Sequence, residues 1–104
     1  MGANVNKTID ALAIGSETIV WTPASGKKFR VMGGLLTVTG GAGDVIFRDG
    51  IGGPTLFVIP NSVLGTPIPF DFGDGFIASS KDNKLTATGV LLAVLNGDIW
   101  GTEE

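Results

Sequence analysis

The sequence contains no cysteine, no histidine and no tyrosine among its 104 residues. Without cysteine there is no disulfide bond, no thiolate nucleophile and no cysteine-ligated metal centre. Without histidine there is no Ser-His-Asp triad and no imidazole ligand for a metal ion. An enzyme would have to build its nucleophile, base and metal ligands from Ser, Thr, Asp, Glu and Lys alone. These absences predict a protein that is not an enzyme, with no cofactor and no metal site.

Charge is also scarce. Charged residues make up 16% of the chain, with a formal net charge of −3, against a norm of about 25% charged residues. Nucleic-acid binding needs clustered lysine and arginine, and only Lys27, Lys28 and Arg30 lie close together. No apolar run approaches the roughly 20 residues of a membrane span, and no secretory signal is visible. The sequence therefore predicts no nucleic-acid partner, no membrane partner and synthesis in the cytoplasm.

Glycine and apolar residues are abundant, with 17 glycines, 5 prolines and 43% hydrophobic residues. A chain of this length supports one domain, and its short apolar runs recur between turn residues every 8–12 positions. This spacing is typical of a sandwich or barrel. We predict a jelly-roll-like β-sandwich of about eight short antiparallel strands over residues 16–104. An immunoglobulin-like sandwich is the alternative, with no cysteine or strand tryptophan to support it.

The first fifteen residues do not fit this pattern. Ala11–Ile14 is apolar but has no clear period, and Gly15 and Ser16 follow it as a break. We predict that residues 1–15 form an extended arm, or a weak first strand, that packs on something else. A short helix over Thr8–Ile14, capped by Thr8, is the alternative. An arm of this kind could be deleted without loss of the fold.

Two predicted strands, Leu56–Ile59 and Val90–Leu95, are apolar on both faces. In a two-layer sandwich one face of each strand should meet water. Either loops or the arm cover the second face, or a neighbouring subunit does, and the low charge content favours the subunit. The predicted partner or oligomer contacts are Ala11, Leu12, Ile14, Leu56, Val58, Val90, Leu92 and Val94.

Four smaller motifs favour structural roles. The carboxylates of Asp71–Gly75 could face Ca²⁺ but lack the full ligand set, so a turn is predicted there. Gly40–Gly43 has no following Lys-Ser/Thr and is predicted to be a hairpin loop rather than a phosphate cradle. Asn96 and Gly97 form a type I′ hairpin signal. Trp21 and Trp100 could offer a sugar-stacking platform, but burial in a core or interface is the favoured interpretation.

Several segments together resemble a known group of proteins. The segment Gly26–Gly40 combines a "G-K-x-hydrophobic-R-V" strand, a small-residue kink, a second strand and a glycine turn. Asp44–Gly50 follows with a "V-x-F-x-x-G" strand, and Phe76–Ser80, Leu85–Gly89 and Val90–Leu95 continue the pattern. This arrangement resembles small all-β virion proteins of tailed bacteriophages.

The resemblance implies a head decoration (cement) protein that binds the major capsid protein and bridges capsomers. It also implies homotrimers and a location on the capsid surface of the virion. The alternative within the resemblance is a glycan- or receptor-binding module of a phage tail or fibre. No catalytic residue is implied by either.

Overall fold

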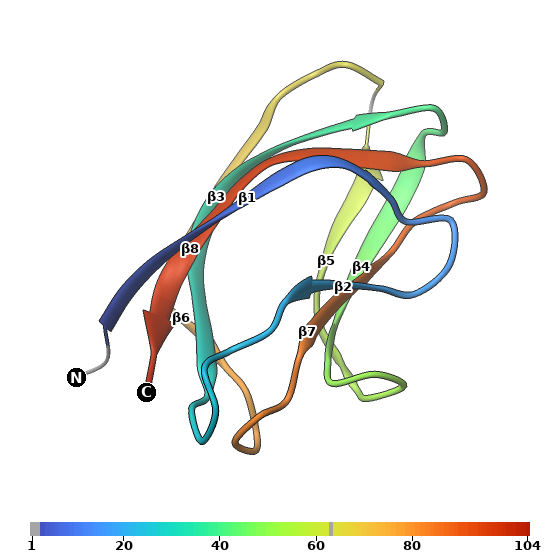
Figure 1. The fold of residues 1–104 in the computed structure, drawn as a ribbon. Coiled ribbons are helices and arrows are strands. Elements are labelled where there is room, and N and C mark those ends of the chain that lie inside the picture. The colour runs from blue at the N-terminus through green and yellow to red at the C-terminus, as the bar shows by residue number, and fades with distance from the viewer. Residues whose placement is uncertain (1–2, 63) are drawn as a thin grey trace.

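The chain folds into two antiparallel β-sheets that face each other (Figure 1). The structure is a computed structural model that describes residues 3–62 and 64–104. Its strands are β1 (Ala3–Ala13), β2 (Thr18–Trp21), β3 (Phe29–Thr39), β4 (Gly43–Asp49), β5 (Thr55–Ser62), β6 (Ile68–Ile77), β7 (Leu85–Thr88) and β8 (Val94–Glu103). No helix occurs in the described residues, so none there is long and apolar enough to cross a membrane. The predicted all-β sandwich of about eight antiparallel strands is confirmed.

The strands pair in a nested order. One sheet has the order β1-β8-β3-β6 and the other has β2-β7-β4-β5. The first strand thus pairs with the last, the second with the seventh, the third with the sixth and the fourth with the fifth. A long hairpin folded over into two layers gives this order.

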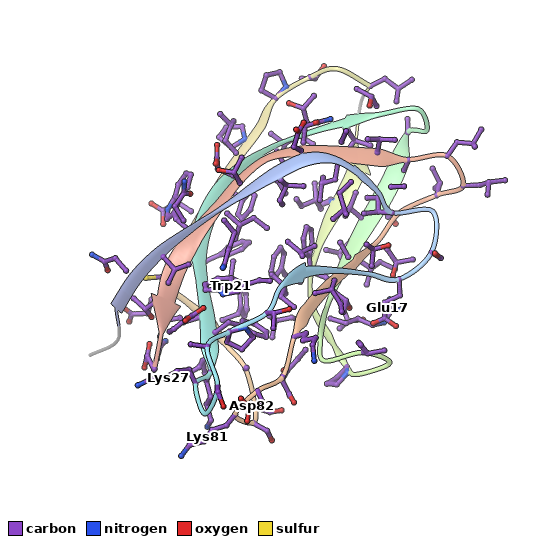
Figure 2. All side chains as sticks on the ribbon, viewed as in Figure 1. Glu17, Trp21, Lys27, Lys81 and Asp82 are labelled. Atoms are coloured by element: carbon purple, nitrogen blue, oxygen red, sulfur yellow. The ribbon has the colours of Figure 1, made fainter. Side chains whose placement is uncertain are left out.

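The core lies between the two sheets and is built by period-2 alternation. Along β3, Phe29, Val31, Leu36 and Val38 are buried. The alternation changes phase at Gly33 and Gly34, which are also buried and follow a register shift. Trp21 is also fully buried between the sheets, where Figure 2 labels it, and its Nε1 donates a hydrogen bond of 2.8 Å to Glu103. The indole N–H of Trp21 is therefore not left unpaired within the apolar layer around it.

The N-terminal segment is part of the sandwich. Ala3–Ala13 forms β1 and pairs with β8 from Ala3–Glu103 to Ala13–Val94, so the weak-strand alternative holds and the free arm and the helix do not. The reason that no period was visible is a β-bulge. Ile9 and Leu12 mark the register shift on either side of it, and the backbone N of Ala11 donates to Asn96 Oδ1 at 2.7 Å. A bulge reverses which face successive residues meet, so the inward positions change from odd to even numbers.

Two predicted local features are wrong, and a third is found within a strand. Val90–Leu95 is not one strand, because a turn closed by the Ala93 N to Val90 O hydrogen bond precedes β8. Asn96 and Gly97 lie inside β8 rather than in a hairpin turn, and Gly97 pairs with residues of β1 and β3 on either side. Asp71–Gly75 makes the predicted turn as a bulge within β6. Four of its residues face only Met32 of β3, Gly73 N donates to Asp71 Oδ1 at 2.8 Å, and Gly73 and Gly75 have positive φ. Asn96 and Gly97 have turn chemistry that strand pairing overrides, whereas Val90–Leu95 has no turn signal and yet contains a turn.

Candidate interaction surfaces

The two ends of the sandwich differ in chemistry. The β1–β2, β3–β4, β5–β6 and β7–β8 connections gather at one end, and the other three connections lie at the opposite end (Figure 1). Lys27, Lys81 and Asp82 lie at that opposite end (Figure 2). Asp82 Oδ1 accepts a hydrogen bond of 2.6 Å from Gly26 N, which ties two of its loops together. One end is therefore polar and charged.

The first end carries an exposed aliphatic turn, which we call the apolar tip and define as Val90, Leu91 and Leu92. Their exposed fractions are 38%, 80% and 72%. Leu64, 52% exposed, lies in the β5–β6 connection at the same end of the sandwich. Exposed leucines in sequence on a turn are unusual, because polar residues, glycine and proline normally occupy such positions.

The apolar tip is held firmly by backbone hydrogen bonds. The turn itself is closed by Ala93 N donating to Val90 O at 3.0 Å. On either side, Gly89 N donates to Ile14 O at 2.6 Å, and Ile14 N donates to Ala93 O at 2.9 Å. Leu92 has a φ of 70°, a left-handed conformation that is a genuine outlier for a bulky residue. The backbone thus keeps the two leucines projecting outward.

Glycines let other loops approach the tip closely. A Cβ on Gly40 would lie 2.1 Å from Leu92 O, one on Gly41 would lie 2.7 Å from Leu91 O, and one on Gly43 would lie 2.6 Å from Val90 Cγ1. The Gly40–Gly43 segment connects two different sheets, so the predicted hairpin loop is wrong. Because its glycines have no side chains, this segment can lie close against the apolar tip.

A second apolar surface lies on the outer face of the β1-β8-β3-β6 sheet. Trp100 is 43% exposed there and lies across Gly33, where a Cβ would come 2.8 Å from Trp100 Nε1. Two hollows border the indole. One, of about 440 Å³, is lined by Asn4, Val5, Asn6, Met32, Trp100 and Gly101. The other, of about 430 Å³, is lined by Gly34, Leu35, Pro69, Phe70, Asp71 and Trp100. Burial in the core is therefore confirmed for Trp21, whereas Trp100 lies outside the core and its burial in an interface stays a prediction.

The predicted contact residues separate into three groups. Ile14 is fully buried in the chain's own core, so it cannot contact a partner. Leu12, Leu56 and Val94 are half-buried, and the first two pack against that core. The exposed ones are Ala11, Val58, Val90 and Leu92. Val90 and Leu92 come together in the apolar tip, and Leu92 and Val94 line one hollow beside it.

Leu91 and Trp100 are two exposed residues that the predicted contact set leaves out. Leu91 belongs to the predicted Val90–Leu95 strand, whereas it occupies an exposed turn. Trp100 follows the buried Ile99, so alternation from Ile99 was the signal that it points outward.

Ionic side chains connect separate elements of the fold. Glu17 accepts hydrogen bonds from Thr86 Oγ1 at 2.6 Å and from Gly52 N at 3.0 Å, and these bonds lower its pKa. Arg30 binds the Glu104 carboxylate, which lowers the pKa of Glu104 to about 2 and raises that of Arg30. The Asp71 carboxylate accepts from Gly73 N at 2.8 Å. Within the described residues no group of three or more acidic side chains is placed to hold a metal ion.

All four sheet edges are interrupted. The edge strands are β1, β6, β2 and β5. β1 and β6 carry the bulges described above, and β2 has four residues with a register shift of its own. Pro60 in β5 and Pro69 in β6 lack an N–H. Short, bulged and proline-bearing edges oppose pairing with a further strand, so side-chain surfaces are the better candidates for association.

The comparisons with known proteins bear on the fold. The sequence matches no protein-family profile and no curated protein. A solved structure of a Bacillus endospore appendage protein, described as belonging to a family of disulfide-linked pili, aligns with 96% of this chain and 80% of its own. The TM-score is 0.50 and the sequence identity is 18%, so the likeness shows a shared fold. This neighbour is a pilus protein. It contradicts the expected phage decoration protein and its alternative, the tail or fibre module.

Proposed function

We propose that this protein is a structural subunit that associates with further copies of itself into an appendage-like assembly. Its role is mechanical rather than catalytic. The fold neighbour supports this proposal, because that protein belongs to pili. The proposal replaces the capsid partner with a second copy of the same chain.

The observation that carries the proposal is the apolar tip. A fixed turn presents Leu91 and Leu92 to solvent at 80% and 72% exposure, in a conformation that disfavours leucine. Rigid, exposed aliphatic groups mark interaction sites on soluble proteins. Because the turn is already fixed, little conformational entropy is lost when it is covered.

Linkage between copies must differ from that of the neighbour. The neighbour's pili are disulfide-linked, whereas this chain contains no cysteine. Copies of this chain therefore cannot be joined by disulfides, and we expect non-covalent contacts to hold the assembly. It should form and dissolve reversibly with concentration and should be insensitive to reducing agents.

The test is the mass of the purified protein by light scattering over a hundredfold concentration range, with electron microscopy of the most concentrated sample. We expect monomers of 10.7 kDa at low concentration and long or open-ended assemblies at high concentration. The variant Leu91→Ser/Leu92→Ser should remain monomeric. The matched control is Ile51→Ser, which removes an aliphatic side chain that is 66% exposed at the opposite end and should assemble as the wild type does. Monomers at every concentration would refute the proposal.

A further inference from the structure

Self-association raises the question of which surfaces of two copies meet. We infer that the apolar tip of one copy docks into the two hollows beside Trp100 of another copy. This inference rests on the proposed function and specifies its contact. It follows from the form, chemistry and position of the two surfaces.

The two surfaces match in form and chemistry. The tip presents two adjacent leucines, and the receiving surface presents two hollows that share one indole wall. The walls of the hollows include the apolar side chains of Met32 and Leu35 and the ring of Trp100. Trp100 and Leu35 are 43% and 44% exposed, so both surfaces gain from burial. Aromatic anchors in such positions dominate contact energies in protein interfaces.

Glycines shape both surfaces. Gly33 leaves room for the Trp100 ring to lie on β3, and a side chain there would collide with Nε1 at 2.8 Å. Gly40 leaves room for the Leu92 carbonyl at the tip. The protrusion and the hollow are thus fixed by backbone, which favours a defined fit over a flexible one.

Position decides the kind of assembly. The tip projects from one end of the sandwich, whereas the hollows open on the outer face of a sheet. Each copy therefore uses two different surfaces, one as donor and one as acceptor. Such head-to-tail contacts form rings when the rotation closes and open filaments when it does not.

Size explains why isolated pairs should be weak. A stable interface needs about 800 Å² from each partner, and a three-residue tip covers only a fraction of that. A pair alone would separate, but a copy inside a chain makes two such contacts. Assembly should therefore appear above a threshold concentration.

The absence of cysteine allows a direct test by cross-linking with introduced cysteines. Ala42→Cys places a thiol beside the tip, because the neighbouring Gly41 and Gly43 approach Val90. Asn4→Cys places one at the rim of the first hollow. The control Ser80→Cys places one at the charged end. Pairs of single-cysteine variants are mixed above the assembly threshold, with one carrying a mass tag, and treated with a short bis-maleimide.

We expect the 42–4 pair to cross-link at least fivefold more than the 42–80 pair. Leu91→Ser/Leu92→Ser in the Ala42→Cys chain should remove this excess. Assembly without the 42–4 excess would overturn the contact and leave the proposed function standing. Dominant 42–42 cross-links would also overturn it, in favour of a tip-to-tip pair. Monomers throughout would refute both proposals. Tip-dependent binding to phosphatidylcholine vesicles without any cross-link would identify a lipid surface as the occupant and would likewise overturn the contact.

Discussion

The turn at Leu92 shows how one residue couples strain to exposure. A left-handed conformation costs an L-residue about 1–2 kcal/mol, and glycine or asparagine avoids most of that cost. Leu92 instead has φ of 70° and is 72% exposed. Strained residues concentrate where a surface performs a function. The apolar tip therefore combines a strained backbone with exposed leucine side chains in one turn. A role as an interaction surface explains both.

Among the glycines that approach the apolar tip, Gly40 should be the most sensitive to substitution. Gly40 and Gly26 have nearly equal φ values of 80° and 78°, but a Cβ at Gly40 would lie 2.1 Å from Leu92 O and one at Gly26 would meet nothing within 4 Å. Gly26→Ala should cost about 1 kcal/mol from the backbone alone. Gly40→Ala should cost a further 1–3 kcal/mol or so from the clash. Urea unfolding of both variants measures the difference. Equal losses would mean that Leu92 moves freely.

Glu17 should make stability depend on acidity. Its pKa is lowered from 4.5, chiefly by the hydrogen bond from Thr86, so the folded state favours the ionised carboxylate. The stabilisation is then complete above the unfolded value and is lost as the pH falls through the lower folded value. Glu17→Gln should lower the melting temperature at pH 7, and the gap to the wild type should shrink below pH 4.5.

Thr86→Val provides the matched control for this pair. It removes the hydroxyl that donates to Glu17 at 2.6 Å. In a double-mutant cycle, the loss from Glu17→Gln should be smaller in the Thr86→Val background. Circular dichroism melts at several pH values give all four corners. A gap that stays constant down to pH 3 would contradict the assigned role of Glu17.

At the scale of elements, strand count and class could be predicted but strand phase could not. Alternation in Phe29–Val31 and Val45–Phe47 is undisturbed, and those strands were found. In β1 a bulge at Ala11 reverses the alternation, so apolar residues before and after it never form one pattern. In the β7–β8 connection a turn contains leucine at its left-handed position, and leucine gives no turn signal. Bulges depend on the partner strand, which lies far away in sequence.

The candidate surfaces, too, could be predicted from the sequence only in part. Val90 and Leu92 were predicted as contacts because their segment is apolar on both faces. For Trp100, alternation from the buried Ile99 indicates the outward direction, but the place of the ring over Gly33 depends on a pairing that only the fold creates. Local composition identifies apolar excess, whereas tertiary pairing decides where it is exposed.

β1 should be indispensable to the sandwich. It pairs with β8 along its length and contributes Ile9, which is 6% exposed. Deleting residues 1–13 would expose the edge of β8 and open the core, at a cost of more than about 5 kcal/mol, which is comparable to the total stability of a small domain. We expect loss of cooperative melting in circular dichroism. A truncated protein that melts as the wild type does would show instead that these residues form an arm that the fold does not need.

At the scale of the whole molecule, one end is apolar and the other is charged. If the apolar tip makes the contact, the assembly should respond to solutes as apolar burial does. Sulfate should promote it and cooling to 4 °C should weaken it, because hydrophobic association falls on cooling.

Raising sodium chloride from 0.05 to 0.5 M should weaken the assembly little, although the Debye length then falls below about 10 Å. If Lys27, Lys81 and Asp82 at the other end made the contact instead, this increase would dissolve it. Light scattering during salt and temperature steps separates the two, with Leu91→Ser/Leu92→Ser as the control that should not respond. Dissolution by sodium chloride alone would move the contact to the charged end.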